Sequence, residues 1–164
     1  EIARAVGIPL KIAAKVDRAD QDYYDELIRP LIESNPLVEY IGEISDREKS
    51  DFLSGAIGLL VPIDWPEPFG LVMIEAMACG TPVIAYNRGS VPEIVEDGKT
   101  GFVVEDELSA ISAVDRLADL DRAEIRKIFE VRFTARRMAL DYLAAYRSLA
   151  EEAEPRIKLV SSAE

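Results

Sequence analysis

The sequence predicts an α/β protein with a doubly wound parallel sheet. Short apolar runs alternate with amphipathic helical stretches as far as Val104, which is typical of parallel strands joined by helices. Glycine, proline, aspartate or asparagine bounds these runs, as expected at strand ends. From Leu108 onward only helical periodicity remains, so C-terminal helices are expected to follow the sheet.

Each expected strand is short and mostly apolar, as strands buried on both faces are. The five runs are Leu10–Ala14, Leu37–Ile41, Ile57–Pro62, Pro82–Tyr86 and Gly101–Val104. Before the first of them, Glu1 to Val6 is expected to form a helix that Gly7 stops.

Helices are expected between the strands. The first runs from about Gln21 to Glu33, with a kink at Pro30. The second begins at Ser45, where Glu48 three residues later completes a capping box. A third starts at Leu71, and a short fourth follows Ser90 with a proline in its first turn.

The C-terminal apolar stripe is expected to be core packing, because its members recur at helical spacing. It comprises Leu108, Ile111, Leu117, Leu120, Ile125, Phe129, Phe133, Met138, Tyr142, Tyr146 and Leu149. Residues 1–150 are therefore expected to form one domain, and residues 151–164 a polar tail with frayed structure.

Composition excludes several function classes. The chain has 31 acidic and 19 basic residues, and a net charge of −12 argues against nucleic acid or an anionic membrane surface as a partner. With no histidine and the single Cys79, neither a disulfide nor a transition-metal cluster is expected, and a reducing cytoplasmic location fits. No secretory signal opens the chain, and the longest apolar run is too short for an integral membrane segment.

The segment from Glu67 to Glu75 contains the candidate binding residues. Its two carboxylates flank a proline-glycine turn that opens into a helix. The N–H groups at such a helix start, together with the helix dipole, favour a phosphate, and carboxylates accept hydrogen bonds from sugar hydroxyls. A sugar nucleotide has both kinds of group, although helix capping alone would also account for two glutamates here.

Four further motifs accompany this turn. They are Gly80 to Ala85 (GTPVIA), Gly89 to Glu93 (GSVPE), Gly98 to Phe102 (GKTGF), and the upstream strand and helix Val38 to Ala56. The strand and helix at Val38 to Ala56 precede the turn, and the other three motifs follow it. With its motifs in this order along the sequence, the chain resembles the C-terminal, donor-binding domain of retaining GT-B glycosyltransferases of family 4. The resemblance implies a Rossmann-like half of a GT-B fold, and transfer of a hexosyl group from a nucleoside-diphosphate sugar.

The resemblance also implies roles for the residues of the turn. Glu75 would bind the ribose hydroxyls, and Glu67, the catalytic candidate, would hold hydroxyls of the donor sugar. The main-chain N–H groups of Phe69, Gly70 and Leu71 would contact sugar and diphosphate. Their alternative explanation is an ordinary helix cap, and both can hold together.

Further upstream, the resemblance implies that Ile41 and Ile44 flank the nucleobase, with the backbone at Gly42 reading its edge. Apolar residues after a strand are, however, more often core. Lys15 follows a strand at the edge where ligands bind, but a solvated surface lysine is the simpler interpretation. Gly89 and Ser90 lie in a turn at the same edge.

One strand is expected to be missing. Domains of the resembling family begin one strand earlier, and the loop after that strand carries an Arg and a Lys that hold the diphosphate. Neither that strand nor that Arg–Lys pair is found in this chain. In a sheet of order 3-2-1-4-5-6 the missing strand is the central one, so the strands at Leu10 and Ile57 should have unpaired edges. The acceptor is expected to bind a separate N-terminal domain.

The implied mechanism retains the anomeric configuration and has the leaving diphosphate help deprotonate the acceptor. It requires no metal and no cofactor beyond the donor. The alternatives are a non-catalytic nucleotide-sugar-binding module, or a sugar-nucleotide epimerase of GT-B fold. A dehydrogenase is disfavoured because no GxGxxG follows a strand. The base, the sugar, the acceptor and the oligomeric state are left open.

Overall fold

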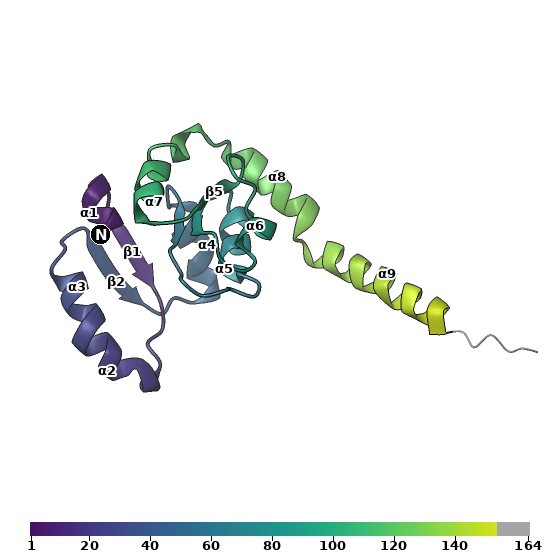
Figure 1. The fold of residues 1–164 in the computed structure, drawn as a ribbon, viewed down its shortest axis with the longest axis horizontal. Coiled ribbons are helices and arrows are strands. Elements are labelled where there is room, and N and C mark those ends of the chain that lie inside the picture. Colours follow the sequence, from purple (N-terminus) through teal and green to yellow (C-terminus); the bar gives the residue numbers. More distant parts are fainter. Residues whose placement is uncertain (154–164) are drawn as a thin grey trace, which may run out of the picture. The chain divides into compact units, whose positions relative to one another are not determined.

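A computed structural model describes residues 1–153 as an α/β fold with parallel strands (Figure 1). The chain divides into a compact unit, Glu1–Phe129, and a second unit that begins at Glu130. The strands are β1 Leu10–Ala13, β2 Val38–Gly42, β3 Leu59–Val61, β4 Val83–Tyr86 and β5 Gly101–Val104. All five coincide with expected strands to within two residues at each end.

The helices come in the expected order. They are α1 Ile2–Val6, η1 Arg18–Asp20, α2 Gln21–Tyr23, η2 Tyr24–Ile28, α3 Arg29–Glu33, α4 Asp46–Ser54, α5 Leu71–Ala78, α6 Val91–Ile94, α7 Glu107–Val114, η3 Leu117–Asp119, α8 Arg122–Arg132 and α9 Ala135–Ala153. The stretch expected as one kinked helix contains the π-helical turn η2, which ends two residues before Pro30. Proline has no N–H to donate and its ring crowds the preceding turn, which explains the irregularity there.

The strands form two parallel sheets. In one, β1 pairs with β2, with Leu10 opposite Val38. In the other the order is β3-β4-β5, with Leu59 opposite Val83 and Val83 opposite Gly101. The doubly wound fold is therefore confirmed, but its sheet is interrupted where the sequence predicts the missing central strand.

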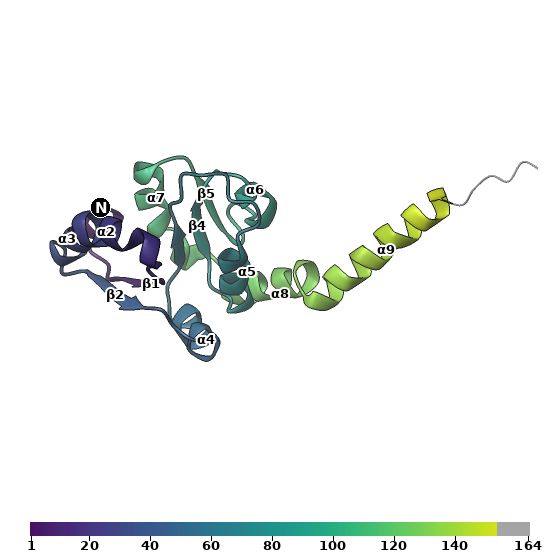
Figure 2. The ribbon, with the colours of Figure 1, turned by 90° about the horizontal axis from the view of Figure 1, so that it is seen from below.

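Helices cover both faces of the three-stranded sheet (Figures 1 and 2). Alternate side chains of a strand point to opposite faces. Ile84 of β4 packs with Phe102, Val104 and residues of α1 and α7 in one apolar cluster. Val83 and Ala85, fully buried, point to the opposite face, and α5 contacts β3 and β4. This packing fixes the start of α5 at one end of the sheet.

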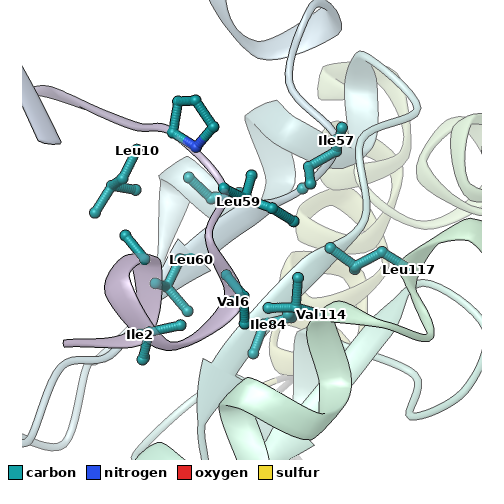
Figure 3. A pocket seen from close by; sticks show the side chains of 13 residues that line it. Ile2, Val6, Leu10, Ile57, Leu59, Leu60, Ile84, Val114 and Leu117 are labelled. Carbon is teal, nitrogen blue, oxygen red and sulfur yellow. The ribbon is translucent and has the colours of Figure 1, made fainter. Parts of the chain in front are cut away.

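The edges of β1 and β3 face a common space. Two pockets lie there, and Leu10, Leu59 and Leu60 line both of them. The smaller, about 70 Å³, is surrounded by apolar side chains of α1, β1, β3 and α7 (Figure 3). The larger, about 660 Å³, extends to the carboxyl ends of β1 and β3, as far as Lys15 and Ile63.

The expectation that the whole C-terminal stripe is core is wrong in part. Ile125 and Leu117 are buried, but Leu108 and, in α9, Met138, Tyr142, Tyr146 and Leu149 are more than half exposed. Helical spacing shows that a helix is amphipathic, and the number of partners available decides whether its apolar face is covered. Within α9, Arg137 pairs with Asp141 and the rings of Tyr142 and Tyr146 are 6.1 Å apart. The helix extends into the expected tail as far as Ala153, and residues 154–164 of that tail lie outside the described residues.

Candidate functional site

The turn before α5 depends on Gly70. This residue is the N-cap of the helix and has a φ of 74°, in the left-handed region that favours glycine. A Cβ at this position would lie 2.1 Å from Cε of Met73, a fully buried core residue. The contact with Met73 falls on the flexible end of that side chain, so the left-handed backbone is the stronger reason for glycine here. This conformation lets the chain enter α5 directly from the loop.

The carboxylate of Glu67 folds back onto this helix start. The backbone N–H of Gly70 donates to Oε1 of Glu67 over 2.9 Å, and that of Phe69 over 3.4 Å. The indole N–H of Trp65 donates to Oε2 over 3.3 Å. The Gly70 N–H, followed by that of Phe69, lowers the pKa of Glu67. The carboxylate is consequently anionic and oriented near neutral pH.

Glu67 stabilises the turn that leads into α5, although its side chain makes no capping hydrogen bond to the helix itself. Two of the three N–H groups expected to contact a donor, those of Phe69 and Gly70, donate to Glu67. Leu71, the third, is the first residue of α5, where the N–H has no partner within the helix. The side chains of Phe69 and Leu71 are more than half exposed, so an apolar surface borders the turn.

Glu75 lies one turn into α5 and lines the larger cavity. Its Oε1 is 2.9 Å from the Nζ of Lys49, which extends from α4 and also pairs with Asp46 over 3.3 Å. The carboxylates of Glu75 and then Asp46 raise the pKa of Lys49. Sequence reasoning missed Lys49, and its place beside the capping box of an amphipathic helix gave no signal of this contact.

The loop after β2 approaches the same cavity. Ile41 and Gly42 close the strand, and Gly42 has a φ of 76°, so it turns the chain sharply. Ile44 and Glu43 line the cavity together with Glu75. The capping box that ends this loop is confirmed, since Oε2 of Glu48 accepts from the backbone N–H of Ser45 over 2.9 Å. The structure thus brings Ile44 and Glu75 to one cavity, whereas Glu67 and the Phe69–Gly70 turn do not line it.

A second turn supports the first. The N–H of Ser90 donates to the carbonyl oxygen of Glu67 over 2.8 Å, and a Cβ on Gly89 would lie 2.3 Å from that oxygen. Arg88 adds a 3.0 Å contact from its Nε to Oδ1 of Asp64, in the loop that leads to the turn. Residues 88–90 therefore hold the backbone that presents Glu67.

Other site classes find little support in the described residues. No three or more His, Cys, Asp or Glu side chains within residues 1–153 gather where they could share a metal ion. No helix in that same part of the chain has both the length and the apolar character needed to cross a bilayer.

Comparison with known proteins decides the family. The model of the family described as glycosyl transferases group 1 matches residues 12–130, more than half of the chain. The chain belongs to this family. The match extends over β2, the turn at Glu67 and α5, that is, over the whole candidate site.

Relatives and solved structures agree with the assignment. The glycogen synthase of Mycobacterium tuberculosis (strain CDC 1551 / Oshkosh) is 31% identical over 76% of this chain and 32% of its own length. The D-inositol 3-phosphate glycosyltransferase of Streptomyces scabiei (strain 87.22) is 41% identical over 42% of this chain and 15% of its own.

Among solved structures, the sucrose-phosphate synthase of Thermosynechococcus elongatus superposes with a TM-score of 0.76 at 30% identity, over 93% of this chain and 42% of that one. Anabaena HepE in complex with UDP and glucose gives a TM-score of 0.74 at 22% identity, over 90% of this chain and 44% of that one, and this likeness shows the fold. The chain spans less than half of the length of each of these four proteins. The predicted resemblance to half of a GT-B glycosyltransferase is confirmed.

Proposed function

We propose that this chain is the donor-binding part of a retaining glycosyltransferase, which moves a hexosyl group from a nucleoside-diphosphate sugar to an acceptor bound elsewhere in the complete protein. The observation that carries the proposal is the position of Glu75. Its carboxylate lines a cavity of about 660 Å³ together with the loop after β2 and the carboxyl ends of β1 and β3. Ligands of open parallel sheets bind at this edge.

This placement predicts which residues would contact each part of the donor. Ile44, with Gly42 and Ile41 behind it, would contact the nucleobase, and Glu75 would accept hydrogen bonds from the ribose hydroxyls. Glu67 and the N–H groups of the Phe69–Leu71 turn would hold sugar and diphosphate. On donor binding, the Glu67 carboxylate would exchange its contacts with Gly70 and Phe69 for sugar hydroxyls, which releases two N–H groups for the ligand.

Positioning and electrostatic stabilisation of the leaving diphosphate would be this chain's catalytic contribution. No base from the described residues is assigned to the acceptor, because the departing diphosphate would take that role.

A second candidate is a binding module without catalysis. It is favoured by the lysines that line the cavity, because all three are paired with carboxylates of this chain: Lys49 with Glu75, Lys15 with Asp17 over 2.7 Å, and Lys11 with Glu39 over 3.3 Å. None of the three is held ready for a diphosphate. Release of nucleoside diphosphate from the donor by the complete protein separates an enzyme from such a module.

A thermal-stabilisation panel tests the proposal. The complete protein is melted with UDP-, GDP- and ADP-sugars, beginning with UDP because HepE, which shares this fold, was solved with UDP. A ligand present at 100 times its dissociation constant adds about 2.7 kcal/mol to stability, so one family of nucleotides should raise the melting temperature by several degrees. The absence of any shift with all three contradicts the proposal.

A further inference from the structure

Lys49 connects the two elements that frame the nucleotide side of the cavity. It lies on α4, and its ammonium reaches Oε1 of Glu75 on α5 over 2.9 Å and Oδ1 of Asp46 over 3.3 Å. The side chains of Lys49 and Glu75 are about one-third exposed, 34% and 38%. Asp46 is 97% exposed, so the contact with Glu75 is the better shielded of the two.

The contact limits how Glu75 can be oriented. A free glutamate samples several rotamers, and fixing it on ligand binding costs conformational entropy. An ammonium bound to Oε1 holds the carboxylate in one position and leaves Oε2 to accept from a ligand hydroxyl.

Lys49 also lies close in sequence to the loop that would contact the nucleobase. It follows the Ser45–Glu48 capping box, which closes the loop containing Ile44. Ile44, Lys49 and Glu75 line the same cavity. The position of Glu75 is thereby linked to the segment that would contact the nucleobase.

We infer that Lys49 is a positioning residue, which holds the carboxylate of Glu75 in the orientation that accepts the ribose hydroxyls of the donor. The inference rests on the proposed function, because it takes Glu75 as the ribose ligand. Lys49 acts through Glu75 and does not itself contact the diphosphate.

The test uses the complete protein and measures the dissociation constants of UDP and of 2′,3′-dideoxy-UDP by calorimetry. If the thermal-stabilisation panel selects another base, GDP or ADP and the corresponding dideoxynucleotide take their place. Lys49→Met keeps much of the side-chain length and removes the charge. It should raise the dissociation constant of the ribonucleotide about threefold to tenfold, as expected for a partly shielded ion pair that acts indirectly. The separate variant Lys49→Arg keeps a cation at this position, and its dissociation constant for the ribonucleotide should lie within about twofold of the wild-type value.

Two comparisons separate positioning from direct binding. In a Glu75→Gln background, Lys49→Met should add no further loss, since the two residues act as one unit. With the dideoxynucleotide, Lys49→Met should have no effect, because the hydroxyls that Glu75 receives are absent. Lys127→Met is the matched control: Lys127 forms a 3.4 Å pair with Glu124 on α8, away from the cavity, and its loss should leave both dissociation constants unchanged.

The outcomes are distinguishable. An equal loss with the ribo- and dideoxynucleotides, or a loss that adds to that of Glu75→Gln, would show that Lys49 binds the diphosphate directly and would overturn the inference. No loss for Lys49→Met alongside a clear loss for Glu75→Gln would overturn it while sparing the proposed function. If Glu75→Gln itself changes nothing, the ribose role in the proposed function fails, and this inference fails with it.

Discussion

The backbone of Gly89 lies directly against that of Glu67: a Cβ on Gly89 would be 2.3 Å from the Glu67 carbonyl oxygen and 2.6 Å from its nitrogen. Gly89 lies in the loop after β4, and Glu67 lies in the loop after β3. The loop that carries the catalytic candidate is therefore supported by contact with a second loop. Ser90 adds a backbone hydrogen bond to the same carbonyl oxygen.

Replacing Gly89 should disturb the site as well as the fold. Gly89→Ala must tolerate a φ of 55° and displace the Glu67 backbone. Gly98→Ala is the matched control, because its φ is 74° but no atom lies within 4 Å of the added Cβ. Gly98→Ala should cost about 1–2 kcal/mol of unfolding free energy from the backbone alone, and Gly89→Ala clearly more, with weaker donor binding. Equal costs in chemical denaturation, with donor affinity unchanged in both, would contradict the supporting role.

Glu67→Gln should impair turnover more than nucleotide binding. Glutamine keeps an oxygen that can accept from the Gly70 N–H, so the helix start is preserved while the charge is lost. We expect kcat to fall at least about tenfold, since the proposed partner is the reacting sugar, and the dissociation constant of the free nucleoside diphosphate to change less than about twofold. Steady-state kinetics and calorimetry on the complete protein measure the two quantities. Equal losses for diphosphate and intact donor would argue against the assignment.

The contact between Glu67 and the helix start should weaken in acid. Hydrogen bonds from Gly70 and Phe69 lower the folded-state pKa of Glu67. A depressed carboxyl pKa gives stability that is present above the unfolded value, about 4.3, and is lost as pH falls through the lower folded value. The amide resonance of Gly70 should therefore titrate with a midpoint below about 4.3 in NMR spectra, and this transition should be absent in Glu67→Gln. A midpoint at or above the ordinary glutamate value would contradict the hydrogen bonds.

The interrupted sheet predicts that β1 and β3 need a further strand. Each pairs on one side only, β1 with β2 and β3 with β4, and together they line both pockets between them. In hydrogen exchange, amides of β1 and β3 in a chain of residues 1–164 alone should exchange faster than those of β4, which is paired on both sides. In the complete protein a strand from outside these residues should remove the difference. A stable monomer of residues 1–164 with equal protection in all three strands would show that no strand is needed.

The sequence predicts the elements well, because their signals are local. Alternating apolar runs locate β1 to β5, and the capping box at Ser45 and Glu48 locates the start of α4. The order of strands in the resembling family also predicts the break between β1 and β3. The π-helical turn before Pro30 could not be predicted, since a proline kink has several backbone solutions.

The side-chain contacts of the site were less predictable. Motif spacing locates Glu67 and Glu75, but it does not reveal that Glu67 binds the N–H groups of Gly70 and Phe69, nor that Glu75 pairs with Lys49. Both contacts depend on rotamers and on packing between segments. For the same reason the apolar stripe of α9 indicates an amphipathic helix without indicating what covers it.

Binding of the donor ribose by Glu75 is the central element of the proposed function. The decisive measurement is the dissociation constant of the donor nucleoside-diphosphate sugar for the complete protein and for its Glu75→Gln variant. Loss of hydrogen bonds to a charged group should cost about 1.5–3 kcal/mol, a rise of about 10- to 150-fold in the dissociation constant. An unchanged dissociation constant in a folded Glu75→Gln variant would contradict the account.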